Sequence, residues 1–371
     1  MLNDGEMVGG IFQPFGVRGR GLAVTDPAKI TGFADAYEVL GPSSPTLGET
    51  HMTSMMAWMI WRAKGDGLIE PTVIGRNSGA SGRRLTEISP GSQCHRNGVT
   101  EIAAAVRLAG AKRIYCPAIT FTHGEADRGA KMDPTAYLAG MLALIAAANA
   151  DWRAVTGQSA PIRLYVSQLC ANSYGHGSLL SQAQLEAAER SDLVRFVCPR
   201  YFLPTGPGSG EHLANVGYQR LGEYYAKAIF SDVIAHEKPH WLRPARVEFD
   251  PRSREVVYAY FDVPSPPLVL DTVGIAQGEA RNMGFAFLDG AGYGNIASVA
   301  LVADNGVKIM LSQASTGSNP TLQYAFNGPG FPDRSHFGAW GNLRDSDPTP
   351  SRLFAGSLVN WAPTFSVPIA G

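Results

Sequence analysis

His212 is the residue in this sequence best suited to acid–base chemistry. It directly precedes a segment in which Leu213, Val216 and Leu221 recur at helical spacing, so one face of the predicted helix can pack against a core. The histidine then lies on a loop held at the N-terminal end of that helix. Because the unperturbed imidazole pKa lies near neutrality, a histidine held in this way suits a general base. A surface histidine at a helix start explains the same pattern equally well.

A glycine-rich loop over residues 75–88 follows a predicted strand and contains Ser81, Gly82 and Arg83. Small residues let backbone N–H groups approach an anion closely. The loop lacks the Gly-Lys-Ser/Thr ending of a Walker loop, which argues against nucleotide phosphates. A plain flexible turn accounts for the glycines as well as an anion site does.

A third loop, over residues 120–127, places His123, Glu125 and Asp127 at alternate positions. These residue types can bind metals, but zinc ligands are usually better separated along the chain and supported by further hydrogen bonds. No metal site is therefore predicted here, and no cofactor is predicted anywhere in the chain.

The elements that must position these loops alternate along the chain. Strands are predicted at 72–75, 113–120, 162–169 and 194–199, and helices at 50–63, 99–109, 134–150, 181–191 and 214–231. Such alternation indicates an open, mostly parallel sheet covered by helices on both faces. Ligands of these sheets gather at the carboxyl ends of the strands. We therefore expect the three loops to meet at one edge of the sheet.

The pattern changes after about residue 236. Runs at 245–249 and 255–262 flank a Pro-Arg-Ser-Arg turn and predict a hairpin, and five further short apolar runs follow before residue 327. This is typical of an antiparallel β-sandwich. We thus predict two domains, an α/β domain over 1–235 and a β-sandwich accessory domain over 236–371.

Two features of the predicted sandwich have alternative interpretations. Trp241, Trp340 and Trp361 could stack on sugars, but a role in the core is the commoner one for tryptophan. The acidic segment 341–347 could bind calcium, although a solvated loop explains it more simply.

Composition excludes some classes of partner. The 371 residues carry a formal net charge of −1, which argues against nucleic acid. No stretch is expected to span a membrane, and residues 1–20 lack the basic start and apolar run of a signal peptide. The four cysteines show no Cys-x-x-Cys spacing, so a structural zinc site is not expected. The sequence assigns neither a compartment nor an oligomeric state, and an extracellular or phage-associated role is compatible with it.

The three loops together resemble the conserved blocks of the SGNH (GDSL-like) hydrolase superfamily, in particular its carbohydrate acetylesterase branch, which includes sialate O-acetylesterases. The segment 123–127, His-Gly-Glu-Ala-Asp, is similar to that branch's Gln-Gly-Glu-Ser/Ala-Asp/Asn block. Ser81-Gly82 is similar to the oxyanion-hole block, and His212-Leu213 with Gly217-Tyr218 to the block of the catalytic histidine. The resemblance covers roughly residues 45–235.

The resemblance implies a flavodoxin-like three-layer fold and removal of O-acetyl groups from carbohydrates, or cleavage of another small ester. A serine would attack the ester carbonyl while His212 takes its proton. The N–H of Gly82, with help from His123, would stabilise the oxyanion. Substrate-binding roles fall on Ser81, Arg83, Gly124, Glu125 and Asp127.

The sequence departs from the family pattern at three positions. No Gly-Asp-Ser or Gly-Gln-Ser turn precedes Gly82, the acidic residue expected three before the histidine is Ser209, and His123 replaces a glutamine. Without the serine, covalent catalysis is lost. If the chain begins downstream of the nucleophile strand, a gap or a substitute segment near 7–14 should appear in the sheet.

Two hypotheses follow from these departures. The first is an esterase domain of impaired activity fused to a β-sandwich. The second is a non-catalytic carbohydrate-binding module, or a phage or surface structural module, derived from such an esterase. The missing serine and acid favour the second hypothesis, whereas the retained His212 and Gly82 favour the first.

Overall fold

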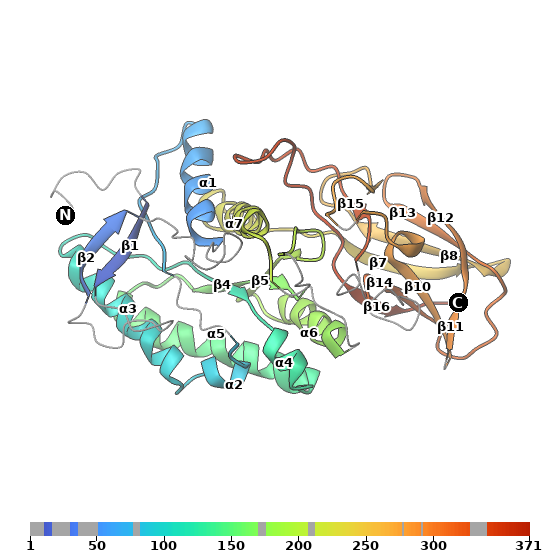
Figure 1. Cartoon of the computed structure of the whole chain (residues 1–371), viewed down its shortest axis with the longest axis horizontal. Helices are drawn as coiled ribbons and strands as arrows, with labels where there is room; N and C mark the ends of the chain where they lie inside the picture. The colour runs from blue at the N-terminus through green and yellow to red at the C-terminus, as the bar shows by residue number, and fades with distance from the viewer. Residues whose placement is uncertain are drawn as a thin grey trace.

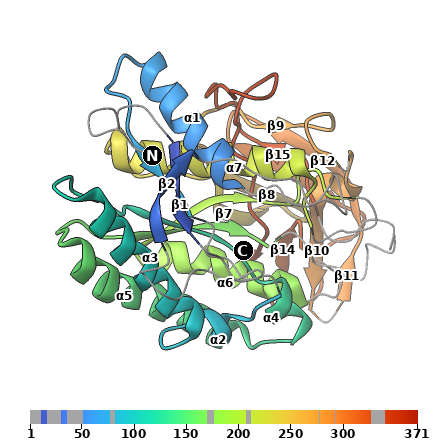
Figure 2. The same cartoon turned by 60° about the vertical axis from the view of Figure 1, so that its left-hand side comes forward.

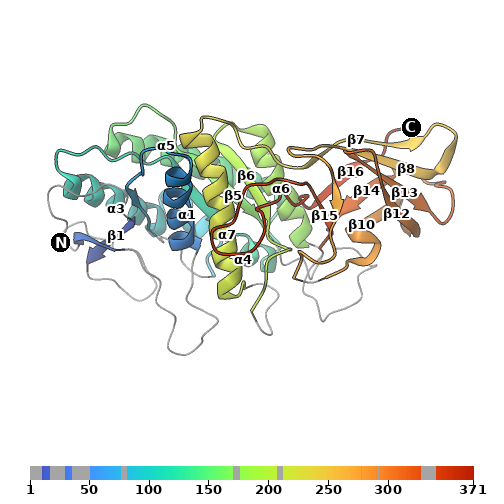
Figure 3. The ribbon, with the colours of Figure 1, turned by 90° about the horizontal axis from the view of Figure 1, so that it is seen from above.

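The computed structural model describes residues 51–76, 82–169, 176–206, 212–276, 278–290, 292–326 and 340–371, together with the backbone of 11–16 and 30–35. It is a mixed α/β fold followed by antiparallel β-structure, and the two parts lie side by side along the long axis of the molecule (Figures 1 and 3).

A three-stranded parallel sheet forms the centre of the α/β part. Its order is β4 (Ala118–Thr122), β5 (Arg163–Gln168) and β6 (Val194–Pro199), so that consecutive strands are neighbours. Because all three strands are parallel, their carboxyl ends meet at one edge, as expected from the sequence. Most of β5 and β6 is buried, which accounts for their continuous apolar runs.

The N-terminal strands form a separate small sheet among the described residues. β1 (Ile11–Gly16) pairs antiparallel with β2 (Ile30–Asp35) and parallel with β3 (Val73–Ile74). Hydrogen bonding between β3 and β4 is not found in the described part of the chain, so the single sheet predicted from the sequence is not seen there. β1 overlaps residues 7–14, the segment expected from the sequence as a substitute for a missing strand.

Helices cover both faces of the parallel sheet (Figures 1 and 2). On one face α1 packs against α7, and on the other α5 packs against α3 and α6. The long helices have the bounds α1 His51–Gly65, α3 Gln93–Ala109, α5 Pro134–Thr156, α6 His176–Arg190 and α7 Asn215–Ile229, the last continuing as a π-helical turn η2, Phe230–Ile234. The short helices α2 (Leu85–Ile88) and α4 (Glu125–Gly129) lie in segments that we had predicted as loops.

Helix α5 begins as the sequence predicts. The Asp133 side chain accepts a hydrogen bond from the Ala136 N–H at 2.8 Å, and Pro134 occupies the first turn. Among the described residues α5 is also the one helix long and apolar enough to cross a membrane, which corrects the expectation that no stretch is. Core helices of water-soluble proteins meet the same criteria, and Tyr137, Met141 and Ile145 of α5 are buried in the core.

The described residues of the C-terminal part form two four-stranded antiparallel sheets, in agreement with the antiparallel structure predicted for it. Their orders are β12-β13-β8-β7 and β11-β10-β14-β16. Phe249 of β7 packs edge-on against Phe287 of β10, and Phe261 of β8 lies 6.1 Å from Phe365 of β16, so the sheets share an aromatic core. The bounds are β7 Arg243–Asp250, β8 Ser253–Asp262, β10 Phe285–Asp289, β11 Gly292–Gly294, β12 Ile296–Val302, β13 Gly306–Leu311, β14 Thr321–Tyr324 and β16 Phe365–Pro368, with a separate pair β9 Val269–Leu270 and β15 Leu343–Arg344.

The C-terminal segment reaches back onto the α/β part, where its red trace loops toward α7 and α1 in Figure 1. The Gln168 side chain lies at the end of β5. Its Oε1 accepts from the Thr364 N–H at 2.8 Å, and its Nε2 donates to the Thr364 carbonyl at 2.9 Å. Lys227 of α7 pairs with Asp347 at 2.8 Å, and the Trp58 indole of α1 donates to the Pro350 carbonyl. One continuous buried cluster therefore extends through both parts of the chain.

Burial bears on two sequence interpretations of the C-terminal part, at Trp361 and at Asp345. Trp361 is 3% exposed and stacks on Phe202 at 5.2 Å, which is a core role. Asp345 of the acidic segment is fully buried, and its carboxylate accepts from Asn360 and Asp347 N–H groups rather than facing solvent. No group of three or more His, Cys, Asp or Glu side chains that could hold a metal occurs in the described part of the chain.

Candidate functional site

His123 directly follows β4 and lies at the edge where the parallel strands end. Its ring stacks between Phe121 and Tyr137, and its side chain is 11% exposed. Nε2 lies 3.1 Å from the Arg83 carbonyl oxygen, which can only accept, so Nε2 carries the proton. Nδ1 then accepts from the Tyr137 hydroxyl at 3.1 Å. Burial lowers the pKa of His123, which keeps the ring neutral in this arrangement.

Gly124 starts helix α4 in a conformation that side chains rarely adopt. Its φ is +126°, and a Cβ there would lie 3.3 Å from the Tyr137 hydroxyl and 3.4 Å from Gln184 Nε2. Gln184, from α6, donates to the His123 carbonyl at 2.9 Å and accepts from the Leu169 N–H at 2.8 Å. Gln184 thus ties the end of β4 to the end of β5.

Glu125 is held by Arg200, the first residue after β6. Arg200 Nη1 lies 2.7 Å from Glu125 Oε1, Nε donates to the Gln168 carbonyl at 3.0 Å, and Nη2 lies 3.4 Å from the His123 carbonyl. Burial raises the pKa of Glu125, but the Arg200 charge outweighs it and holds the pKa below its usual value. One guanidinium therefore joins the carboxyl ends of all three parallel strands.

Asp127 is buried and faces the protein rather than solvent. It is 1% exposed, and its Oδ2 accepts from the Leu85 N–H at 2.9 Å, at the start of α2. The same oxygen lies 3.6 Å from His123 Nε2. Burial raises the pKa of Asp127 more than the neighbouring histidine lowers it. Direct substrate contact by this carboxylate would require α2 to move.

The segment beginning at Gly82 also contacts His123, through the Arg83 carbonyl. Gly82 is exposed with a φ of +72°, and nothing lies within 4 Å of the position that a Cβ would take. The Arg83 side chain is 49% exposed and pairs with Glu87 at 2.7 Å, while the Arg83 carbonyl binds His123. Ser81 lies outside the described residues.

His212 is exposed just before α7, as the helical spacing predicts. Backbone hydrogen bonds fix its loop to the segment after β6, from Gly206 N–H to the His212 carbonyl at 2.8 Å and from Ala214 N–H to the Pro204 carbonyl at 3.0 Å. Ser209 and Glu211, the positions compared with the family's orienting acid, lie outside the described residues.

The structure thus brings together the loops after β4 and β6 and the segment beginning at Gly82, as predicted from the strand order. His212 is joined to them through the loop after β6. The carboxyl end of β5 is different, because the C-terminal segment covers it through Thr364. Of the site residues predicted from the sequence, Gly82, Arg83 and His212 are exposed.

Sequence reasoning missed the side chains that hold this site. Arg200 could have been found, because it stands at the carboxyl end of a predicted strand, where ligand-facing residues gather. Tyr137 and Gln184 lie within helices and have no local signal of their role.

A polar network lies between the sheet and the α1–α7 pair, and it too was missed. His51 Nε2 lies 2.8 Å from Thr120 Oγ1, and the Tyr225 hydroxyl lies 2.9 Å from both Thr122 Oγ1 and Ser167 Oγ. Burial, with a smaller effect of the Arg200 charge, lowers the pKa of His51 to about 4. The histidine is therefore neutral at physiological pH.

Comparisons with known proteins add little to this geometry. No family model and no curated protein matches the sequence. Among solved structures, a protein from Arabidopsis thaliana aligns with a TM-score of 0.44 and 18% identity, covering 60% of this chain and 81% of that one. The S-layer protein rSbsC aligns with a TM-score of 0.22 and 12% identity, covering 77% of this chain and 26% of that one. Similarities of this size carry no argument about fold family or function.

Proposed function

We propose that this chain is an SGNH-like protein that binds O-acylated carbohydrates at the carboxyl edge of the parallel sheet, without Ser/His turnover. The observation that carries the proposal is the end of β1. This strand pairs in parallel with β3, which the glycine loop follows in the sequence, and it ends in Phe15-Gly16. The family's nucleophile would follow the strand in this position, and the sequence has no serine there.

The remaining architecture is compatible with a flavodoxin-like arrangement. A parallel sheet lies between two layers of helices, and the three loops that resemble the family blocks gather at one edge of that sheet. This arrangement supports recognition of a small ligand between Gly82 and His212. Both residues are exposed. Backbone hydrogen bonds fix the His212 loop, and the His123 ring binds the Arg83 carbonyl next to Gly82.

The environment of His123 argues against an intact oxyanion site. Both ring nitrogens are already engaged, one with the Arg83 carbonyl and the other with the Tyr137 hydroxyl. A donor for a developing oxyanion must point at the reacting oxygen rather than at a protein carbonyl. His123 would therefore act by holding the Arg83 carbonyl, and so the Gly82 loop, in position.

Binding and turnover are tested with the same protein preparation. Isothermal titration calorimetry should detect binding of 9-O-acetyl-N-acetylneuraminate to the protein, and weaker binding of the deacetylated sugar. His212→Ala should weaken binding of the acetylated sugar. His236→Ala, at an exposed histidine that follows α7 and η2 in the sequence, should leave that binding unchanged. Equal affinities for the two sugars, or none for either, would overturn the proposal.

A second candidate function, hydrolysis of the same esters, is favoured by the exposed His212 at the mouth of α7 and by the open backbone of Gly82. In that case His212 acts as base for a serine outside the described residues, the Gly82 N–H binds the oxyanion, and water then releases the acyl group. Release of p-nitrophenol from p-nitrophenyl acetate that disappears in His212→Ala would establish it. A rate equal to that of buffer excludes it for this protein.

A further inference from the structure

A cavity of about 500 Å³ lies away from the strand-end site, where the α/β part meets the antiparallel part. Its walls include the Trp241 side chain, the rings of Pro239 and Pro264, and the Arg243–Asp262 pair. This volume falls within the range of small-molecule sites, which combine apolar walls with a few polar groups. The cavity therefore has the size of a binding site, and its lining is more polar than that of most small-molecule sites because Lys238, His240, Arg243 and Asp262 also contribute to it.

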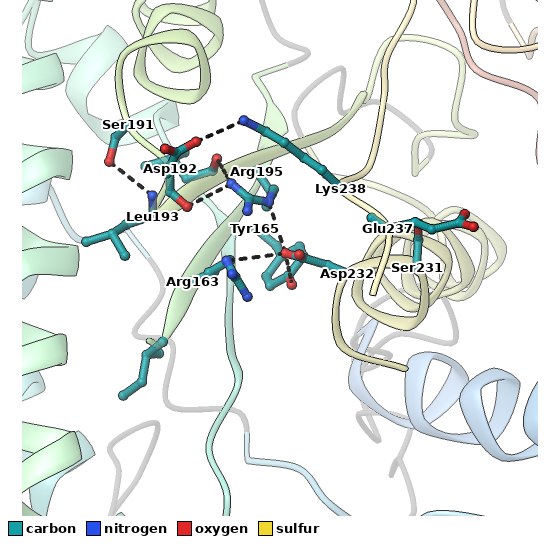
Figure 4. Close-up of polar contacts among 12 residues, drawn as sticks. Arg163, Tyr165, Ser191, Asp192, Leu193, Arg195, Ser231, Asp232, Glu237 and Lys238 are labelled. Carbon is teal, nitrogen blue, oxygen red and sulfur yellow. Dashed lines mark hydrogen bonds and ion pairs between the residues drawn. The ribbon is translucent and has the colours of Figure 1, made fainter. Parts of the chain in front are cut away.

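The segment that forms one wall of the cavity is firmly anchored (Figure 4). Asp232, in the turn that precedes it, accepts from the Tyr165 hydroxyl at 2.8 Å and from Arg195 Nε at 2.9 Å. Lys238 pairs with Asp192 at 2.9 Å, and Trp241 packs on Phe196 of β6. A pre-ordered wall lowers the entropic cost of binding a ligand.

An aromatic strip extends from the cavity along the outer face of β8. Tyr258, Tyr260 and Asp262 alternate with buried residues, so all three side chains point outward. The two half-buried tyrosine rings lie 6.2 Å apart with planes only 20° from parallel. Because Asp262 also lines the cavity, the strip and the cavity form one continuous surface.

The charged side chains of β7 beside this strip are paired with one another, whereas Lys308 of β13 lies opposite Tyr258 on the other side of the strip. On β7, opposite the strip, Arg243 binds Asp262 at 2.8 Å. Arg246 lies 3.4 Å from Glu248 and covers one face of the Tyr260 ring at 4.6 Å. Its side chain is 61% exposed, and a cation–π contact at such a site is weak, so a ligand that packs on this ring displaces the guanidinium. Paired charges of this kind give little net field, which disfavours a polyanionic ligand. They do supply donors and acceptors side by side.

We propose that this surface, defined by Trp241, Arg243, Tyr258, Tyr260 and Asp262, binds a neutral oligosaccharide. The C–H faces of pyranose rings pack against aromatic rings, and each sugar hydroxyl both donates and accepts. Arg243 uses Nε for Asp262 and retains its terminal amino groups as donors, while the second oxygen of Asp262 can accept. In this proposal the sugar chain lies along the strip from Tyr258 to Asp262, with one end in the cavity.

Affinity electrophoresis of the full chain in gels containing neutral polysaccharides (hydroxyethylcellulose, arabinoxylan, galactomannan and laminarin) tests this surface. At least one polysaccharide should retard the protein. Tyr260→Ala should weaken that binding at least tenfold, and Tyr260→Phe should largely preserve it. Trp61→Ala, at an exposed tryptophan of α1 outside this surface, is the matched control and should leave binding unchanged.

Trp241→Ala is expected to weaken binding as Tyr260→Ala does, with circular dichroism used to verify folding because Trp241 packs on Phe196. Retardation by none of the four polysaccharides, or retardation that Tyr260→Ala leaves intact, overturns the proposal. So does a preference for heparin that added salt abolishes. His212→Ala should have no effect here, which separates this surface from the strand-end site.

Discussion

Arg200 makes the strongest quantitative prediction, because its guanidinium joins the ends of three strands. The substitution Arg200→Met keeps much of the side-chain volume but removes every donor. It leaves the Glu125 carboxylate and the carbonyl oxygens of Gln168 and His123 without their partner on Arg200. The Arg200 side chain is only 3% exposed, so water cannot readily replace it.

The expected cost follows from this burial. Removing one partner of a buried ion pair typically costs about 3 to 5 kcal/mol, because the other charge stays desolvated and unpaired. Glu125 is 24% exposed, which allows some hydration and favours the lower end of that range. We therefore expect Arg200→Met to reduce the free energy of unfolding by about 3 kcal/mol.

Equilibrium urea unfolding at pH 7, followed by far-UV circular dichroism, measures this cost. Arg190→Met is the matched control, since Arg190 is 62% exposed and pairs with Glu186 on the surface of α6. Its loss should cost less than about 1 kcal/mol. Adding Glu125→Gln to Arg200→Met should restore part of the stability, because the unpaired charge is gone.

Two results would refute this reasoning. One is a cost for Arg200→Met no larger than that of Arg190→Met. The other is strict additivity of the Glu125 and Arg200 substitutions, which would mean that the two side chains do not interact in the folded protein.

Three further predictions concern α1 and α7. The pKa of His51 is about 4 in the folded protein, against 6.5 in the unfolded chain. Titration of His51 therefore leaves the free energy of unfolding unchanged above pH 6.5 and lowers it by about 3 kcal/mol as the pH falls towards 4. In urea unfolding, His51→Gln should flatten that part of the dependence of stability on pH. Gly222→Ala should cost about 1 to 3 kcal/mol in thermal unfolding, because a Cβ would overlap Ser54 Oγ, whereas Gly65→Ala, with nothing within 4 Å, should not destabilise. Glu223 is fully buried and accepts from three donors of the C-terminal segment, so Glu223→Leu should cost about 2 kcal/mol and speed hydrogen exchange over 351–354; unchanged exchange there would contradict the assignment.

Local patterns predicted most of the α/β elements. β6 matches its apolar run residue for residue, because Val194–Pro199 is buried on both faces. The prediction for β4 began too early, at residue 113, since Pro117 lacks the N–H needed for pairing and the strand starts after it. Helix α3 begins six residues before its predicted start, at Gln93, where Ser92 caps it by accepting from the His95 N–H.

The candidate site was predictable in outline only. Alternating strands and helices indicate that the loops after β4 and β6 meet, and they do. Which side chains face the ligand depends on contacts far apart in sequence, such as Arg200 with Glu125 and Asp127 with the start of α2. Those contacts convert Glu125 and Asp127, which looked like substrate ligands, into residues that hold the backbone in place. Nothing in the local sequence carries that information.

The bond between Gln168 and Thr364 has a consequence for biosynthesis. These residues are 196 positions apart. During translation the end of β5 emerges long before its partner, so this edge of the central sheet stays open on the ribosome. Domains generally fold as their residues leave the exit tunnel. Here the end of β5 can acquire this contact only once a further 196 residues have been made.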